Sequence, residues 1–330
     1  MNLDNRFLWY KLTNVKGLGS KSLLMIYNKL ARGTVSIQDI FRLSKEDFYS
    51  IFSDFGKGKF SKLKYENFHN LDEEKIFSIF EQLQEKEVEI IPIQYDSYPK
   101  IIKKRLKINS PTILYCKGNL SLLKFKSISI VGSRHIDEAT LNLAKNISSN
   151  LAKNGYNIVS GYAKGVDTMA HLGALEVKKT TSIILPLGIN NLSIKRDFRR
   201  LEWKSNSLFI SNFPPNEKWR ARNAMERNKI IAALSEAIVI ITSGPERDEK
   251  GRMSGTFNTG KTSLEMNIPV YVLSPSLFDN PPKGNIDLIT LGGIEVKTSE
   301  AILTHLLNYN NELLNDTSLD NTKHQLSLNL

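Results

Sequence analysis

Apolar residues recur every three or four positions through the first part of the chain. This spacing is typical of short helices that bury one face against a shared core. Residues 1–85 are therefore expected to form a small helical domain. Its predicted helices are Asn5–Leu12, Ser20–Leu30, Ser36–Leu43, Lys45–Phe52 and Asp72–Lys86.

The turn Gly17-Leu18-Gly19 lies between the first two of these helices. It resembles the turn of a helix-hairpin-helix (or SAM-like) domain, whose glycines let backbone N–H groups approach a DNA phosphate. A short Gly-x-Gly between helices more often serves only as a tight turn. The sequence slightly favours the plain turn.

The pattern breaks between residues 86 and 125. Short apolar runs at Glu89–Ile93 and Thr112–Cys116 predict two strands, but proline and other turn residues surround them. Turn residues at this density are typical of connecting segments. Residues 86–125 are therefore expected to form a connecting arm rather than part of the core.

From residue 126 to about 305, near-continuous apolar runs alternate with helical patterns. Such runs are typical of strands buried on both faces of a parallel sheet. Asp137 should cap the first helix and Asn154-Gly155 should end it. The predicted fold class is α/β, a doubly wound, mostly parallel Rossmann-like sheet, with a loosely ordered polar tail at 306–330. The expected strands are Ser127–Val131, Tyr156–Val159, Thr181–Leu187, Ser207–Asn212, Ala237–Thr242 and Val270–Leu273.

Two of these strands end in glycine-containing turns that lead directly into helices. In a parallel sheet such turns lie side by side, and the N–H groups of the helix starts attract an anion. Arg134 and Lys164 add full positive charges, so the two turns predict a phosphate cradle. Its residues are Gly132, Ser133, Arg134, Ser160, Gly161, Lys164 and Gly165.

Each turn taken alone is equally well explained by structure, because glycine permits a tight turn after a strand in many α/β proteins. The fingerprint Gly-x-Gly-x-x-Gly is absent from both turns, which disfavours a nicotinamide or flavin dehydrogenase. Gly132 and Gly161 are expected where the backbone approaches phosphate. Alanine at either position should then impair binding more than stability.

The formal net charge is +11 and the isoelectric point about 9.4, which favours a polyanionic partner, nucleic acid before membrane lipid. Cys116 is the only cysteine, so no internal disulfide and no cysteine-based zinc site is expected. The histidines lack metal-ligand spacing, and neither a metal nor a cofactor is expected. The chain lacks a signal peptide and a bilayer-spanning run, so a cytoplasmic protein without membrane insertion is expected.

Positive charge and aromatic residues interleave after residue 195. This pattern suits a groove that holds phosphates and stacks bases, although a solvated helix face over core aromatics also produces it, and the core better explains Trp203. Arg227-Asn228-Lys229 precedes an apolar helix, so its side chains are expected at a helix start beside the glycine turns. The residues of the pattern are Lys195, Arg196, Phe198, Arg199, Arg200, Trp203, Lys204, Phe213, Lys218, Trp219, Arg220, Arg222, Arg227 and Lys229.

Asp167 and His171 lie four residues apart on one predicted helix face and could be taken for an acid–base pair. A simpler interpretation is an aspartate that is favourable at the positive end of the helix and a histidine that orders the pocket. The motifs offer neither a nucleophile with its base nor paired carboxylates. No catalytic residue is therefore expected.

The motifs together resemble those of the DNA-processing protein A family, also called Smf. The resemblance covers roughly residues 85–300, in order and spacing, and the helical start is similar too. It rests on Gly132-Ser133-Arg134, on Ser160-Gly161-x-Ala163-x-Gly165-Val166-Asp167 with His171, on Arg227-Asn228-Lys229-Ile230-Ile231-Ala232, on Ser254-Gly255-Thr256 with Thr259, and on Gly284-Asn285 with Ile289 and Gly292.

The resemblance implies a Rossmann-like domain that binds single-stranded DNA in a basic pocket, forms a homodimer and hands the DNA to the recombinase RecA in natural transformation or recombination. It implies no bond cleavage. It extends the candidate binding site beyond the cradle to Asp167, His171, Arg227, Asn228, Lys229, Ser254, Gly255 and Thr256.

Two other functions remain open at this point. A nucleotide-monophosphate glycosidase of related fold would share the Gly255-Thr256 turn, but its fuller Pro-Gly-Gly-x-Gly-Thr-x-x-Glu pattern is absent. A defence-associated nucleotide-sensing module could use the same pocket for a small ligand. Release of free base from nucleoside monophosphates would identify the enzyme.

Overall fold

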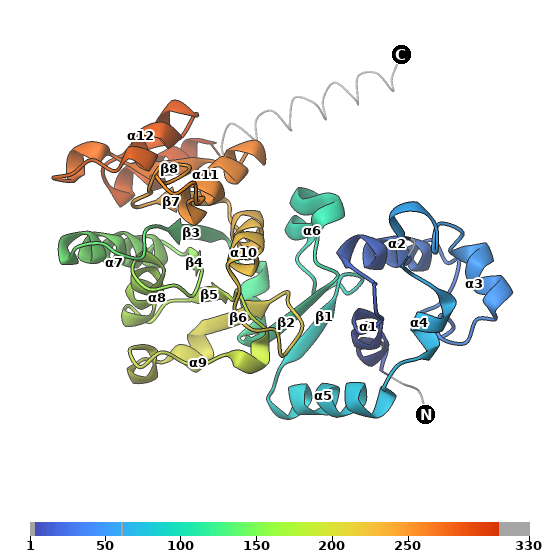
Figure 1. The fold of residues 1–330 in the computed structure, drawn as a ribbon. Coiled ribbons are helices and arrows are strands. Elements are labelled where there is room, and N and C mark those ends of the chain that lie inside the picture. The colour runs from blue at the N-terminus through green and yellow to red at the C-terminus, as the bar shows by residue number, and fades with distance from the viewer. Residues whose placement is uncertain (1–3, 61, 310–330) are drawn as a thin grey trace, which may run out of the picture.

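The structure is a computed structural model that describes residues 4–60 and 62–309 (Figure 1). Its described part is built on a nine-stranded sheet in the order β1-β2-β6-β5-β4-β3-β7-β8-β9. Neighbours from β6 to β9 are parallel, and β1 and β2 pair antiparallel at one edge. The strands are β1 Glu89–Pro92, β2 Ile113–Gly118, β3 Ser127–Val131, β4 Asn157–Ser160, β5 Thr181–Ile184, β6 Ser207–Ser211, β7 Ala237–Ile240, β8 Val270–Leu273 and β9 Ile294–Val296.

Helices cover both faces of the sheet, which confirms the doubly wound α/β fold. Ile128 and Ile130 of β3 pack in one core with α7 (Glu138–Lys153), α8 (Val166–Glu176) and the helical residues 299–309. The opposite face packs against α10 (Ala221–Leu234), α11 (Gly255–Glu265) and α12 (Lys283–Thr290). A hydrogen bond links this face of the sheet to α10: Ser129 Oγ of β3 donates to Ile231 O at 3.1 Å.

Helix α7 begins and ends where the sequence predicts. The Asp137 side chain accepts a hydrogen bond from Thr140 N at 2.6 Å and so caps the helix. Asn154 is the C-cap residue of α7, and Gly155 follows it with φ +90°. This left-handed conformation favours glycine.

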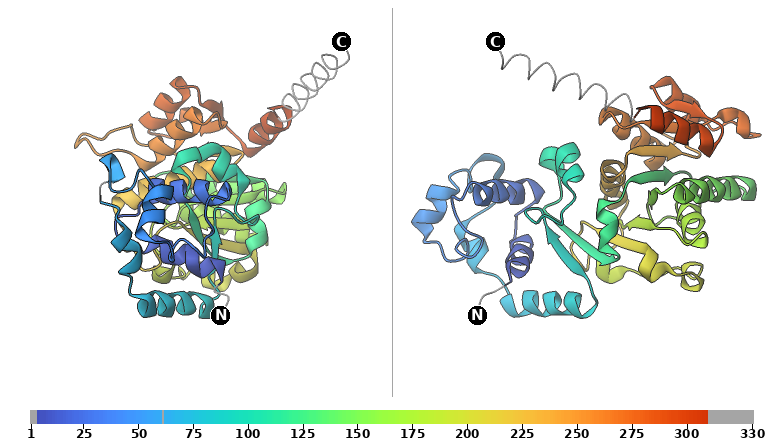
Figure 2. Two further views of the ribbon diagram at one scale, coloured as in Figure 1. Left: turned by 90° about the vertical axis from the view of Figure 1, so that its right-hand side faces the viewer. Right: turned by 180° about the vertical axis from the view of Figure 1, so that it is seen from behind.

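The chain starts as a helical domain that stands beside the β1 edge of the sheet (Figures 1 and 2). Its helices are α1 Asn5–Thr13, α2 Ser20–Ala31, α3 Lys45–Ile51, α4 Tyr65–His69 and α5 Glu73–Glu85. Phe48 is fully buried and contacts Phe52, Phe55 and Phe68 at ring-centroid distances of 4.9–5.9 Å. This domain therefore has its own aromatic core, and Tyr10 also packs edge-on against Tyr115 of β2.

The predicted helix at Ser36–Leu43 is wrong, because these residues form successive turns. Asp39 N donates to Ser36 Oγ at 3.2 Å, and such a local bond competes with helical hydrogen bonding. Ile37 and Ile40 are nevertheless buried, which explains the helix-like spacing. Two short helices, α4 and α6 (Lys100–Leu106), were not predicted.

The expectation that 86–125 is an arm outside the core is also wrong for its strands. β2 pairs with β6 of the Rossmann-like sheet, and β1 pairs with β2. Ile90, Leu114 and Cys116 are 0–3% exposed. Tertiary pairing thus extends the sheet through a segment whose local signal is dominated by turns.

Two further boundaries differ from the sequence expectation. A helix was expected between β5 and β6, but no long helix joins them in the described chain. The connection contains short 3₁₀ turns and α9 (Trp203–Asn206). Turn-forming residues explain this, since the segment contains Pro186, Gly188 and Asn190. Residues 299–309 are helical, so the final helix passes the expected boundary at 305. The remainder of the predicted tail, 310–330, lies outside the described residues.

No helix among the described residues combines the length and apolar character needed to cross a bilayer.

Candidate nucleic-acid interface

Two strand-to-helix turns form the floor of the candidate site. Gly132-Ser133-Arg134 follows β3, while the turn after β4 passes through Gly165 into α8. Val166 N donates to Ser133 O at 3.3 Å, and a Cβ at Gly165 would lie 2.5 Å from the same oxygen. Gly165 also has φ +74°, which an L side chain rarely adopts. The two turns therefore touch, as the sequence predicts.

A cavity of about 890 Å³ lies over these turns, between α10 and the start of α11. A second cavity of about 370 Å³ adjoins it and is lined also by Lys164, Pro186 and Leu187. Since five residues line both cavities, they form one depression at the carboxyl edge of the sheet, which we call the edge groove. The shared residues are Arg134, His135, Ala163, Trp219 and Arg227.

The edge groove is rich in available positive charge. Arg134, Lys164 and Arg222 are exposed, and within the described chain none of them forms an ion pair. Trp219 lines both cavities with 52% of its surface exposed. Cations beside an exposed aromatic ring can hold a phosphate backbone and stack a base.

Arg227 corrects the sequence expectation, because it does not lie at a helix start. α10 begins at Ala221, and Arg227 is inside the helix and only 4% exposed. Its Nη1 donates to Ile184 O at 3.1 Å and lies 3.9 Å from Asp167 Oδ2. Its Nε has no hydrogen-bond partner in the described part of the chain. The guanidinium thus ties α10 to β5 and α8 beneath the groove.

Asp167 is buried with Arg227 and is held by the turn after β4. Its Oδ2 accepts a hydrogen bond from Ala163 N at 3.3 Å. Burial raises the pKa of Asp167, and the Arg227 charge opposes this shift. Asp167 therefore compensates the buried guanidinium rather than facing a ligand alone.

His171 is fully buried one turn along α8. Nε2 lies 2.6 Å from Gly161 O and Nδ1 lies 2.6 Å from Thr181 Oγ1. Burial lowers the pKa of His171 to about 3, so the ring is neutral at neutral pH, and because a carbonyl only accepts, Nε2 carries the proton. The histidine orders the turn at Gly161. In residues 4–60 and 62–309 no group of three or more His, Cys, Asp or Glu side chains is placed to hold a metal.

Lys195 supports the same turn, whereas the sequence named it only as one member of the basic run and not among the motif residues of the site. Its Nζ donates to Ala163 O at 2.8 Å and to Thr168 Oγ1 at 2.7 Å, and lies 4.5 Å from the Tyr162 ring centroid. Burial lowers the pKa of Lys195 to about 8. The basic run after residue 195 was the available signal, but it did not distinguish Lys195 from its neighbours.

The third predicted turn forms a wall of the edge groove. Ser254 Oγ accepts from Phe257 N at 3.2 Å and caps α11, while Gly255 and Thr256 line the cavity. Asn228 Nδ2 donates to Gly255 O at 3.1 Å. Asn228 therefore braces α10 against the start of α11.

Lys229 lies away from the edge groove, which is a second correction. A separation of two residues turns the side chain by about 200° around a helix, so Arg227 and Lys229 occupy opposite faces of α10. Lys229 Nζ pairs with Glu226 Oε2 at 2.8 Å. It lines a separate cavity of about 300 Å³ together with Gly19 and Ser20 of the helical domain.

Gly132 and Gly161 are required by packing, which corrects the expectation that alanine there costs little stability. A Cβ at Gly132 would lie 2.5 Å from Val166 Cγ2. A Cβ at Gly161 would overlap Arg227 Nη1 and Asp167 Oδ2. Ser160 is likewise internal, since its Oγ donates to Ile130 O at 2.6 Å.

Comparison with known proteins places these features in a family. The sequence model of the family described as DNA recombination-mediator protein A matches residues 89–307, which include the whole sheet and the edge groove. The chain belongs to this family. The resemblance to DNA-processing protein A proteins that the motifs indicate is thereby confirmed.

Two relatives illustrate the extent of the similarity. Protein Smf of Borreliella burgdorferi is 27% identical over 291 residues, which cover 87% of this chain and 84% of that protein. The DNA processing protein DprA of Streptococcus pneumoniae is 29% identical over 234 residues, covering 70% of this chain and 79% of that protein. The chain is thus a member of a DNA-processing family.

Solved structures share the fold. The X-ray structure of Streptococcus pneumoniae DNA processing protein A has a TM-score of 0.73 at 24% identity and covers 92% of this chain and 98% of that one. DNA processing protein A from Helicobacter pylori, whose structure is described for its single-stranded DNA binding mode, has a TM-score of 0.54 at 24% identity. It covers 67% of this chain and 96% of that chain.

Proposed function

We propose that the edge groove binds single-stranded DNA and that the protein delivers this DNA to RecA during transformation or recombination. The observation that carries the proposal is that Arg134, Lys164 and Arg222 line the same groove as the exposed ring of Trp219. Cations of this kind neutralise phosphates, and an aromatic face accepts any base. The Helicobacter pylori relative, described for single-stranded DNA binding, supports the same ligand class.

The groove favours a single strand over a duplex on chemical grounds. Base stacking on Trp219 needs an unstacked base, which a duplex does not offer. The contacts otherwise address phosphates, so little sequence preference is expected. Binding should therefore be general for single strands and steeply dependent on salt.

Charge removal on opposite edges of the sheet tests the site. The double variant Arg134→Ala/Lys164→Ala removes two cations from the groove. As the control, Lys126→Ala/Lys153→Ala removes two exposed cations, one just before β3 and one at the end of α7, which lie at the amino ends of the strands. We expect the first variant to lose most single-stranded DNA affinity, on the order of 2–4 kcal/mol for two charge-assisted contacts, and the second to retain it.

If the two double variants lost equal DNA affinity, the loss would be explained by net charge alone, and the edge groove would be excluded as the binding site. A normal melting temperature for both variants is the control that the fold is intact. Both cations of the groove are exposed, so their removal leaves no buried group unpaired.

We propose that the protein acts by binding and not by catalysis. Both ring nitrogens of His171 are engaged in hydrogen bonds, and Asp167, which lines the larger cavity, has its carboxylate 3.9 Å from the Arg227 guanidinium, which supports a structural role for both residues. Incubation with nucleoside monophosphates and with labelled oligonucleotides should release neither free base nor shorter strands. Release of either product, lost in an Arg134→Ala variant, would show that the groove is an active site.

We further propose that the protein works as a cytoplasmic homodimer that contacts RecA. Exposed apolar residues on and beside α12, namely Leu277, Ile286 and Leu291 at 41–52% exposure, support a self-association surface near the β9 edge. Light scattering should give twice the chain mass for the parent and the chain mass for Ile286→Asp. If the parent protein were monomeric, the homodimer would be refuted. If the protein did not accelerate RecA assembly on single-stranded DNA, the delivery step would be refuted.

A further inference from the structure

A charged hairpin, residues 245–253, connects β7 to α11 and forms part of the wall of the edge groove. Six of its nine residues are charged. Of these six, only Asp248 and Arg252 line the larger cavity. The hairpin therefore presents one acid and one base to the groove.

Hydrogen bonds across the hairpin fix its shape. Ser254 N donates to Glu246 O and Asp248 N donates to Arg252 O, each at 3.0 Å. The Glu246 carboxylate also pairs with Lys261 Nζ of α11 at 2.8 Å. Because these bonds hold both the strands of the hairpin and its base, its tip has a defined position beside the groove.

Asp248 accepts hydrogen bonds on both of its carboxylate oxygens. Oδ1 accepts from Lys250 N and from Arg252 N, each at 2.9 Å, and Oδ2 accepts from Arg252 Nε at 2.7 Å. The bond from the Arg252 backbone N–H, followed by the bond from its side chain, lowers the pKa of Asp248 below its ordinary value, so the carboxylate is ionised at neutral pH. Asp248 thus fixes both the backbone and the side chain of Arg252.

This contact uses only one nitrogen of the Arg252 guanidinium. The side chain is 74% exposed, and among residues 4–60 and 62–309 neither Nη1 nor Nη2 has a hydrogen-bond or ion-pair partner. The donors on these two nitrogens form a planar fork that matches the oxygens of a phosphate. Ordering a long side chain opposes binding, but Asp248 already orders this one in the free protein. Arg252 is therefore preorganised to bind an anion at the groove wall.

We propose that Arg252 binds a phosphate of the DNA strand in the edge groove and that Asp248 is its positioning residue. This inference rests on the proposed function of the groove. Nε remains bound to Asp248 while Nη1 and Nη2 contact the phosphate. An acidic residue then strengthens the binding of a polyanion, whereas charge repulsion alone would weaken it.

Neutralisation of Asp248 separates positioning from repulsion. Asp248→Asn keeps an oxygen for the two backbone N–H groups but replaces the acceptor of Arg252 Nε by an amide nitrogen, which only donates. We expect Asp248→Asn to bind a labelled oligothymidine about threefold more weakly than the parent, and Arg252→Ala about tenfold more weakly. In the Arg252→Ala background, Asp248→Asn should weaken binding no further. Tighter binding by the single variant Asp248→Asn would show repulsion and overturn the positioning role.

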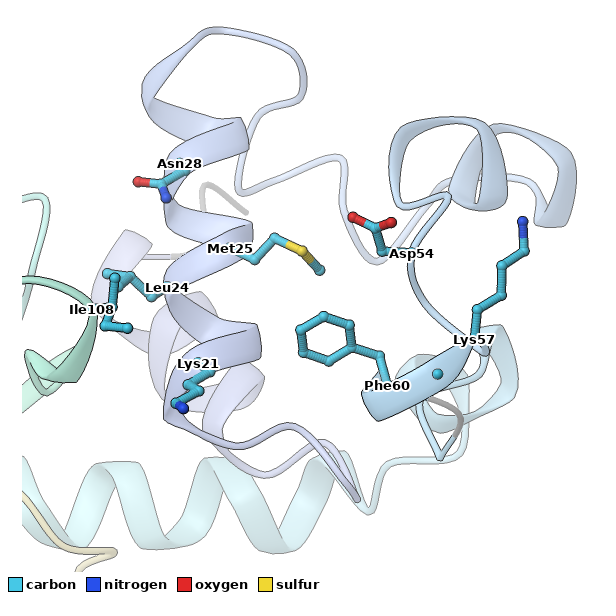
Figure 3. Close-up of a pocket in the computed structure, with 9 residues that line it drawn as sticks. Lys21, Leu24, Met25, Asn28, Asp54, Lys57, Phe60 and Ile108 are labelled. Atoms are coloured by element: carbon cyan, nitrogen blue, oxygen red, sulfur yellow. The ribbon is translucent and has the colours of Figure 1, made fainter.

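A hollow of about 550 Å³ in the helical domain provides matched controls (Figure 3). Asp54 and Lys57 line it and are exposed, and the hollow shares no lining residue with the edge groove. Asp54→Asn and Lys57→Ala therefore change the net charge as the two hairpin variants do, but away from the groove. Both controls should bind DNA like the parent. If each control lost as much affinity as its hairpin counterpart, net charge would explain the losses and the proposal would be wrong.

Salt dependence gives a second readout. A phosphate contact by Arg252 should steepen the slope of log affinity against log salt by about 0.7 beyond the part due to Arg134, Lys164 and Arg222, and Arg252→Ala should remove this increment. If the parent did not bind the oligonucleotide, the proposed function would fail and this inference with it. If the parent bound but Arg252→Ala kept both affinity and slope, this inference alone would be refuted.

Discussion

Substitution of Gly161 by alanine tests the buried scaffold beneath the edge groove. A methyl group there would overlap the Arg227 guanidinium and the Asp167 carboxylate, so the pair must move. Arg227 would then lose its 3.1 Å bond to Ile184 O, and Asp167 would lose its compensating charge. The same change also presses on the turn that His171 holds through Gly161 O.

The expected cost follows from these contacts. Overpacking a dense interior costs about 1–3 kcal/mol, and a hydrogen bond of a buried charged group contributes about 1.5–3 kcal/mol. Because the guanidinium can relax in part toward the cavity, we expect a loss of about 3 kcal/mol in the free energy of unfolding. That corresponds to a fall of roughly 6–12 °C in melting temperature for a domain of this size.

Gly244 provides the matched control. It lines the larger cavity, but a Cβ there would meet nothing within 4 Å, and its φ is not positive. Melting curves by circular dichroism should therefore leave Gly244→Ala within about 1 °C of the parent. If Gly161→Ala melted with the parent, the packing of Arg227 over Gly161 would be refuted.

Three further changes probe the groove and its supports. Trp219→Ala should weaken single-stranded DNA binding by about 1–3 kcal/mol, whereas Trp219→Phe should retain most of the affinity, because stacking needs only an aromatic face. An equal loss of affinity in the two variants would exclude stacking. Raising the pH from about 7 to 9 should weaken binding, because burial lowers the pKa of Lys195 to about 8 and the turn at Ala163, which lines the groove, then loses the charge that supports it. Lys195→Met should abolish this pH dependence, and its persistence in that variant would assign it to another group. Burial lowers the pKa of His171 to about 3, below its unfolded value near 6.5. The contribution of the neutral ring to the free energy of unfolding is therefore complete above pH 6.5 and decreases as the pH drops toward 3, by about 2 kcal/mol at pH 5. Equal melting temperatures at pH 5 and pH 7 would contradict a neutral buried ring.

Local sequence patterns predicted the turns of the site because these turns are local structures. A strand that stops at Gly132 or Ser160 and passes into a capped helix carries its own signal within about ten residues. The contact between the two turns followed from parallel strand order alone. Family motifs then added Ser254-Gly255-Thr256, which the structure places in the wall of the same cavity.

The remaining site features depend on tertiary structure. Arg227 was expected at a helix start because the apolar residues begin after it, yet α10 starts at Ala221 and buries Arg227. Helical geometry then separates Arg227 from Lys229, and this could have been inferred once the helix start was known. The burial of Lys195 under the β4–α8 turn and the pairing of β2 with β6 arise from contacts distant in sequence.

The salt dependence of single-stranded DNA binding tests the central claim most directly. Affinity for a labelled oligothymidine is measured by fluorescence anisotropy across sodium chloride concentrations, for the parent and for Arg134→Ala/Lys164→Ala. With Arg134, Lys164 and Arg222 near the strand, log affinity should fall with log salt at a slope of about −2, and each cation removed should flatten it by about 0.7. A slope near zero for the parent, or an unchanged slope in the double variant, would contradict a groove that holds DNA through these side chains.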